Sequence, residues 1–253
     1  MKLLCIGNSY SQDACTYMHR MADAVGFWLE TRNLYIGGCS LERHYANLIS
    51  GEAAYNYEVN GDVHAKKKIS IDEALAEAEW DAVSIQQVST KSGLYETYFP
   101  YATALAERIR SVCPRARLLV HETWAYEVSR PHDYGTQADM HRALHDAYYR
   151  VAKEIGADAV VPTGDVIAEL RKNAFFDVTR GGESLCRDGS HLSLSYGRYT
   201  AGATFCEVLG VPGLAKNPFL PDAEGTAVTR EGIALVKEAV ARVVAQSAGL
   251  ANG

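Results

Sequence analysis

Two short polar segments of the chain contain residue types that together can perform nucleophilic catalysis. In Gly7-Asn8-Ser9-Tyr10-Ser11, a serine follows the apolar run 3–6 and a glycine. In Asp188-Gly189-Ser190-His191, a carboxylate precedes an imidazole by three residues. Serine is a weak nucleophile at neutral pH, so it needs a base within hydrogen-bond reach, and a carboxylate commonly orients that base. Between them, the two segments supply a nucleophile, a base and an acid.

Each segment also has an ordinary structural interpretation. A serine between a strand and a helix, such as Ser9 or Ser11, often caps the helix. Asp, Gly and Ser are common turn residues, so Asp188 and His191 can equally belong to a solvated surface turn. For either segment taken alone, the structural interpretation is favoured.

Alternating strand and helix patterns surround these segments. Apolar runs that end in glycine or polar residues predict strands at 3–6, 27–36, 81–87, 117–121 and 157–161. Apolar residues at helical spacing predict helices at 13–25, 41–49, 71–79, 98–112, 137–155, 164–173, 195–209 and 231–246. Strands separated by helices form βαβ units. The pattern therefore predicts an α/β fold with a five-stranded parallel sheet that helices cover on both faces.

The strongest hairpin signal lies at about 55–69. Asn60-Gly61 separates two strand-like segments, 55–59 and 62–69, and this dipeptide suits the tight turn that matches strand twist. We expect this hairpin to be an excursion from the main sheet.

Small or polar residues follow the predicted parallel strands. Open α/β sheets bind ligands at the carboxyl ends of their strands. Here those ends carry Ser9, Gly37-Gly38, Gln86-Gln87 and the segment 121–124, and we expect them to converge on one cleft. The candidate substrate-binding residues are His121, Trp124, Tyr126 and Gln86. The two aromatic side chains offer flat apolar faces to an acyl group or a sugar, and ordinary loop packing is the alternative.

The order of these segments resembles that of the SGNH, or GDSL-like, hydrolase superfamily. The similarity is greatest to a branch of mostly uncharacterised proteins with a Gly-Asn-Ser-Tyr/Phe-Ser opening, and it extends from Gly7 to His191. The resemblance implies that Ser9 is the nucleophile of a triad with His191 and Asp188. It also implies a flavodoxin-like three-layer α/β/α sandwich, formed by one domain spanning residues 1–253.

The same resemblance implies an oxyanion hole formed by the backbone N–H groups of Ser9 and Gly38 and by a side-chain amide. The family's third block usually reads Gly-x-Asn-Asp, whereas this chain has Ile85-Gln86-Gln87-Val88-Ser89. A glutamine amide can replace an asparagine amide as a donor. We expect Gln87 to be that donor, with Gln86 and Ser89 as alternatives.

The implied function is a serine esterase that forms an acyl-enzyme. Branches of the superfamily that deacetylate glycans suggest a small acyl ester, an O-acetyl group on a carbohydrate, as the substrate. A lipid or thioester hydrolase would use the same triad. A non-catalytic module that binds a glycan or a small molecule is the alternative outside enzymes.

Composition excludes several partners. The chain has 253 residues, 47% of them hydrophobic, and a formal net charge of -6, which gives no basic surface for nucleic acid or an anionic membrane. No apolar segment approaches the ~18 residues that span a bilayer. We therefore expect a cytoplasmic protein, unless a leader has been removed, and no cofactor. The six cysteines lack CxxC spacing and are interpreted as reduced, mostly buried thiols.

His141 and His145 lie four residues apart in a predicted helix, a spacing that can hold zinc. Asp139 and Asp146 are near them in sequence. A third ligand or a glutamate base at metalloprotease spacing does not follow, so the pair is interpreted as a solvated helix face and no metal is expected.

Overall fold

The computed structural model describes residues 1–64, 67–222 and 227–250. Within these residues, the strands are β1 Lys2–Gly7, β2 Glu30–Tyr35, β3 Tyr55–Val59, β4 Lys68–Ile69, β5 Ala82–Ile85, β6 Arg117–His121 and β7 Ala159–Val161. The α-helices are α1 Ser9–Asp23, α2 Leu41–Ser50, α3 Ile71–Ala76, α4 Tyr101–Val112, α5 Gln137–Glu154, α6 Thr163–Leu170, α7 Tyr196–Leu209 and α8 Arg230–Leu250. Short 3₁₀ helices are η1 Tyr95–Tyr98, η2 Val178–Arg180 and η3 Leu214–Lys216.

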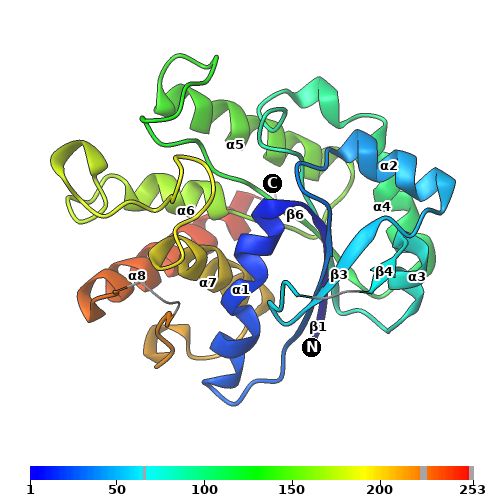
Figure 1. Ribbon diagram of the computed structural model, residues 1–253, viewed down its shortest axis with the longest axis horizontal. Helices are drawn as coiled ribbons and strands as arrows, with labels where there is room; N and C mark the ends of the chain where they lie inside the picture. The colour runs from blue at the N-terminus through cyan, green and yellow to red at the C-terminus, as the bar shows by residue number, and fades with distance from the viewer. Residues whose placement is uncertain (65–66, 223–226, 251–253) are drawn as a thin grey trace.

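The described strands form one open sheet in the order β4-β3-β2-β1-β5-β6-β7. Strands β2, β1, β5, β6 and β7 all pair in parallel, which confirms the predicted five-stranded parallel sheet. Helices α1, α6, α7 and α8 pack together beside the sheet, and α2, α3 and α4 pack together on its other side (Figure 1). The three-layer α/β/α arrangement is therefore confirmed.

The hairpin at 55–69 is part of the main sheet, not an excursion from it. Strand β3 pairs antiparallel with β2, and β4 pairs antiparallel with β3, so the hairpin extends one edge of the parallel sheet. The predicted turn is present, because Asn60 has a φ of 52° and Val59 bridges to Asp62. Residues 65–66 of the predicted second arm lie outside the described residues.

The sheet has its topological switch point at β1. The chain leaves β1 through α1 to reach β2 on one side, and it later returns past β1 to form β5 on the other side. Register aligns the carboxyl ends, because Gly7 pairs with Tyr35 and Ile6 with Ile85. The residues that follow β1, β2 and β5 therefore meet at one edge of the sheet, where ligands bind in this architecture.

Helix α1 is capped by Asn8. The Asn8 side chain accepts a hydrogen bond from the Tyr10 N–H at 3.0 Å. The interpretation of Ser9 or Ser11 as the cap is wrong, because the helix begins at Ser9 and Ser11 already lies within its first turn. The Ser11 hydroxyl instead contacts the Asn8 carbonyl at 2.8 Å and the Asn33 side-chain oxygen at 2.7 Å. Ser9 is thus the first helical residue, at the positive end of the α1 dipole.

The structure also tests the predictions for the helix at 98–112, for the cysteines and for membrane-spanning segments. The predicted helix 98–112 is shorter, because Phe99 is extended before Pro100 and α4 begins only at Tyr101. All six cysteines are free and buried, as expected. Among the described residues, no helix has the length and apolar character needed to cross a membrane.

A buried histidine makes stability depend on pH. His44 in α2 is fully buried, and burial, with the nearby Arg43 cation, lowers its pKa to about 3. In the unfolded chain a histidine titrates near 6.5. The unfolded state therefore binds a proton first as the pH falls, so stability is lost between about pH 6.5 and pH 3. When the pH is lowered from 7 to 5, the free energy of unfolding measured with urea should fall by about 2 kcal/mol more in wild type than in His44→Gln. Equal losses in both proteins would show that His44 is not buried as a neutral group.

Candidate active site

Ser9, His191 and Asp188 form a hydrogen-bonded row at the carboxyl edge of the sheet. The Ser9 Oγ lies 3.0 Å from His191 Nε2, and His191 Nδ1 lies 2.6 Å from an Asp188 carboxylate oxygen. This is the geometry in which an imidazole can take a proton from a serine hydroxyl while a carboxylate fixes its tautomer. The structure therefore brings together the three residues that the sequence selects.

The tight turn 188–191 determines the orientation and the pKa of the Asp188 carboxylate. Gly189 has a φ of 78°, a conformation that favours glycine, and it lets the chain reverse so that Asp188 faces His191. Partial burial acts to raise the pKa of Asp188, but hydrogen bonds from the N–H groups and side chains of His191 and Ser190 hold it well below its usual range. Asp188 thus stays ionised. Its side chain is 46% exposed, and that of His191 is 32% exposed.

Asp13 of α1 anchors this turn. Its side chain is fully buried and accepts hydrogen bonds from the Leu192 N–H at 2.9 Å and from Arg198 Nε at 2.8 Å. Arg187 donates to both carboxylate oxygens, at 3.0 and 3.1 Å, and also to the Leu192 carbonyl. One buried carboxylate in the helix that starts with Ser9 therefore holds both ends of the turn that carries His191.

An aromatic stack supports the imidazole. The rings of Tyr10 and Trp124 stack with centroids 4.2 Å apart, and the Tyr10 ring meets His191 edge-on at 5.7 Å. Trp124 Nε1 donates to the Ser190 carbonyl at 2.7 Å. The stack thus contacts both the His191 ring and the residue before it.

Asn8 joins the three neighbouring strand ends. Its side-chain nitrogen donates to the Cys39 carbonyl after β2 at 2.9 Å, and its oxygen accepts from Gln86 Nε2 after β5 at 2.9 Å. The Gln86 oxygen lies 3.0 Å from His121 Nδ1, and His121 Nε2 lies 3.1 Å from the Thr163 hydroxyl. Burial lowers the pKa of His121 to about 3, so the ring is neutral and can donate through only one nitrogen.

The expected oxyanion donors have different surroundings. Gly38 is exposed, and a Cβ built on it would meet nothing within 4 Å, so there is open space beside this residue. The Gln87 amide has other partners, because its nitrogen donates to the Thr97 carbonyl at 3.1 Å and its oxygen accepts from the Leu41 N–H at 3.0 Å. The Ser89 hydroxyl accepts from the Tyr126 hydroxyl at 2.9 Å. Gln87 therefore holds the loop before α4 against the start of α2.

The four side chains considered for substrate binding lie beneath the site. The exposed fractions are 0% for His121 and Trp124, 2% for Gln86 and 5% for Tyr126. A fully buried ring cannot stack on a sugar, and these side chains contact Ser190, Asn8 and Ser89 instead. They support the turns that carry Ser9 and His191 and offer little surface to a ligand.

Residues 2–241 match the protein family described as "Domain of unknown function (DUF4886)". The chain belongs to the DUF4886 family. It is 32% identical to a DUF4886 family protein from Bacteroides uniformis ATCC 8492 whose crystal structure is known, with a TM-score of 0.88. That match covers 98% of this chain and 96% of the other.

More distant solved structures share the fold of this DUF4886 chain. A proposed SGNH hydrolase from Slackia heliotrinireducens is 22% identical, with a TM-score of 0.57 over 83% of this chain and 99% of the other. An acetyl xylan esterase, AlAXEase, is 12% identical, with a TM-score of 0.55 over 83% of this chain and 100% of the other. The DUF4886 chain therefore has the fold of the SGNH hydrolases, as the sequence resemblance predicts. No curated protein sequence gives a significant match.

Sequence reasoning missed several supporting residues of the DUF4886 site. Asp13 is an acid on an otherwise apolar helix face, and that pattern was the available signal for a buried ion pair. Its partners Arg187 and Arg198 lie more than 170 residues away in sequence, so no local pattern connects them. Tyr10 follows Ser9 directly, but its stacking on Trp124 depends on the pairing of β1, β5 and β6.

Proposed function

We propose that the chain is a serine esterase in which Ser9, His191 and Asp188 act as nucleophile, base and acid. The observation that carries this proposal is the 3.0 Å contact between Ser9 Oγ and His191 Nε2, with Asp188 on the other ring nitrogen. His191 takes the Ser9 proton as the Ser9 oxygen attacks an ester carbonyl. It then gives that proton to the leaving alcohol, and water hydrolyses the acyl-enzyme by the same path.

The backbone supplies the oxyanion donors in this proposal. Ser9 is the first residue of α1, so its N–H has no acceptor within the helix and points out of the positive end of the dipole. The Gly38 N–H is the second donor. A donor of this kind contributes about 3 kcal/mol to the transition state. Because the Gln87 amide contacts Thr97, we propose that its role is to hold the neighbouring loop.

We further propose that the substrate is a small acyl ester, an O-acetyl group on a carbohydrate. The partly exposed His191 and Asp188 side chains and the open space beside Gly38 support this, because a short acyl group needs little enclosing surface and a large alcohol needs room. The shared fold with an acetyl xylan esterase is consistent with this substrate. A lipid or thioester hydrolase would use the same triad but would prefer other acyl groups.

A substrate series tests the proposal. Purified wild type should hydrolyse p-nitrophenyl acetate and acetylated xylo-oligosaccharides, with lower kcat/KM for p-nitrophenyl decanoate and for a thioester. A fluorophosphonate probe should label the peptide that contains Ser9. Preference for the decanoate or the thioester would favour the alternative hydrolases. Absence of both turnover and labelling would instead favour a non-catalytic module that binds a glycan or small molecule.

The variant Trp124→Phe tests whether Trp124 supports the turn that carries His191 or stacks on the substrate. Trp124 Nε1 donates to the Ser190 carbonyl, and a hydrogen bond of this kind is worth about 1 kcal/mol. We expect kcat on p-nitrophenyl acetate to fall about fivefold, with KM nearly unchanged, because the buried ring does not contact substrate. Trp28→Phe is the matched control, since Trp28 is 58% exposed and should not affect either constant. A raised KM with unchanged kcat would mean that Trp124 binds substrate.

A further inference from the structure

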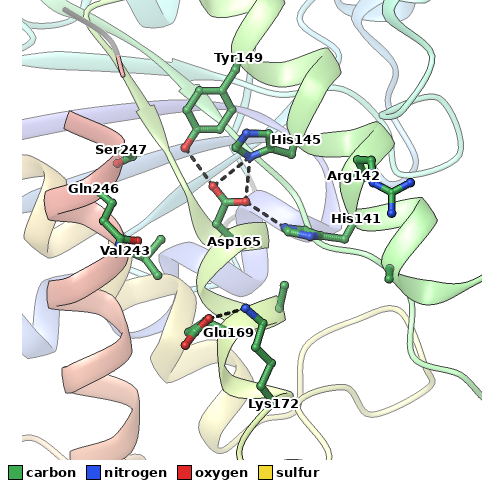
Figure 2. A pocket seen from close by; sticks show the side chains of 12 residues that line it. His141, Arg142, His145, Tyr149, Asp165, Glu169, Lys172, Val243, Gln246 and Ser247 are labelled. Atoms are coloured by element: carbon green, nitrogen blue, oxygen red, sulfur yellow. Dashed lines mark hydrogen bonds and ion pairs between the residues drawn. The ribbon is translucent and has the colours of Figure 1, made fainter. Parts of the chain in front are cut away.

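A second cluster of polar side chains lies where α5, α6 and α8 meet. His141 and His145 extend from the same face of α5 toward Asp165 in the first turn of α6 (Figure 2). These three residues and Tyr149 line a pocket that Gln246 and Ser247 of α8 border on the other side. The interpretation of the two histidines as a solvated helix face is therefore incomplete, because the fold supplies an acid that the sequence spacing does not.

The Asp165 carboxylate is the centre of this cluster. Its Oδ1 lies 2.9 Å from His141 Nε2 and 2.9 Å from His145 Nδ1. Its Oδ2 accepts a hydrogen bond from the Tyr149 hydroxyl at 3.0 Å. The carboxylate is thus held in one orientation from three directions.

Glu122, which follows β6, completes the cluster from inside the protein. One donor atom from each of Glu122, His145 and Asp165 lies within 4.8 Å of the others. Glu122 is fully buried, and its Oε2 accepts from the Asp165 N–H at 3.1 Å. Its Oε1 has no hydrogen-bond partner among the described residues. A buried carboxylate oxygen without a partner requires an explanation, because native proteins rarely leave such an atom unsatisfied.

The backbone is shaped to admit this carboxylate. A Cβ on Gly164 would lie 3.0 Å from Glu122 Oε1 and 2.2 Å from the Thr123 carbonyl oxygen, so only glycine allows this approach. Glu122 is fully buried and Asp165 is half-buried, and two carboxylates so close together repel each other unless a positive charge lies beside them. That charge is either a metal ion or a proton, carried by Glu122 or by one of the two histidines that contact Asp165.

We propose that Glu122, His145 and Asp165 bind a divalent transition-metal ion of the Zn²⁺ class. One imidazole nitrogen and two carboxylate oxygens form a donor set that zinc prefers, and three protein ligands leave a position for water on the pocket side. Zinc takes these donors at about 2.0–2.2 Å, so the cluster needs to contract by roughly an ångström. His141 and Tyr149 are positioning residues, because they hold Asp165 in place.

Metal titration of the full chain tests this site. The purified protein is treated with a chelator, dialysed, and titrated with ZnCl₂ by calorimetry and with CoCl₂ by visible absorption. We expect one equivalent of Zn²⁺, a Co²⁺ spectrum with intense visible bands typical of low coordination number, and a Tm that rises with metal concentration. Glu122→Gln, His145→Gln and Asp165→Asn should each weaken Zn²⁺ binding at least ~100-fold. His141→Gln should weaken it about 10- to 100-fold.

Two controls decide between this site and unspecific binding. Asp146 is exposed on the same helix, so Asp146→Asn should bind Zn²⁺ like wild type. Ser9→Ala should also bind it fully, which separates the metal site from the proposed esterase site. The absence of saturable binding in wild type would overturn the proposal and leave a proton, on Glu122 or on a histidine beside Asp165, as the positive charge. Unchanged affinity in Glu122→Gln or Asp165→Asn would also overturn it.

Discussion

Ser9→Ala is expected to lower kcat/KM for p-nitrophenyl acetate by about 10⁴-fold or more. The substitution removes the oxygen that lies 3.0 Å from His191 Nε2, so no acyl-enzyme can form. His191→Ala should cost a similar factor, because a serine hydroxyl without a base is a weak nucleophile. Initial-rate kinetics on both variants, with circular dichroism to confirm folding, give the measurement.

The double variant sharpens this prediction. When residues act as one catalytic unit, the effects of substituting them are not additive. The double variant Ser9→Ala/His191→Ala should therefore be no less active than either single variant. Ser11→Ala is the matched control, since the Ser11 hydroxyl points inward to Asn33 and should leave kcat/KM within about tenfold. Retained activity in Ser9→Ala would show that another group is the nucleophile.

Asp13→Asn is expected to have the largest effect on stability. The substitution leaves Arg187 and Arg198 without their buried counter-charge, and breaking a buried ion pair in this way costs about 3–5 kcal/mol. It also weakens the contact to the Leu192 N–H, which fixes the turn beside His191. We therefore expect a lower urea midpoint and, at urea-free conditions where the variant is folded, a reduced kcat.

Asp23→Asn is the control for this prediction. Asp23 lies at the end of the same helix and is exposed, so its substitution should change the free energy of unfolding by less than about 0.5 kcal/mol. If Asp13→Asn unfolds at the same urea concentration as wild type, the buried carboxylate does not anchor the turn.

The parallel sheet could be predicted from the sequence because its strands are short apolar runs buried on both faces. Leu3, Leu4 and Ile6 of β1 are almost completely buried, and the run ends at a glycine. The place of the hairpin could not be predicted in the same way. Asn60-Gly61 determines the turn but does not determine that β3 pairs with β2, since that pairing is a long-range contact.

The candidate site shows the same division. Ser9 and Asp188 to His191 have local signals, because each belongs to a turn whose residue types suit its geometry. For Gln87, the only indication in the sequence is its position after a predicted strand. A glutamine amide can find hydrogen-bond partners in many directions, and here it contacts Thr97. The approach of Glu122 to Asp165 also had no local signal, since it depends on the pairing of β6 with β7.

Ser9 and His191 are separated by 182 positions in the chain. During synthesis Ser9 therefore emerges from the ribosome 182 residues before His191, and in the proposed mechanism its hydroxyl is activated only after the turn with His191 has emerged and docked. Contacts between such distant residues also form late in refolding, because closing a long loop precedes any gain from the contact. During refolding, ester hydrolysis should thus recover only when folding is complete. A nascent chain that still lacks the turn with His191 should have no activated serine hydroxyl.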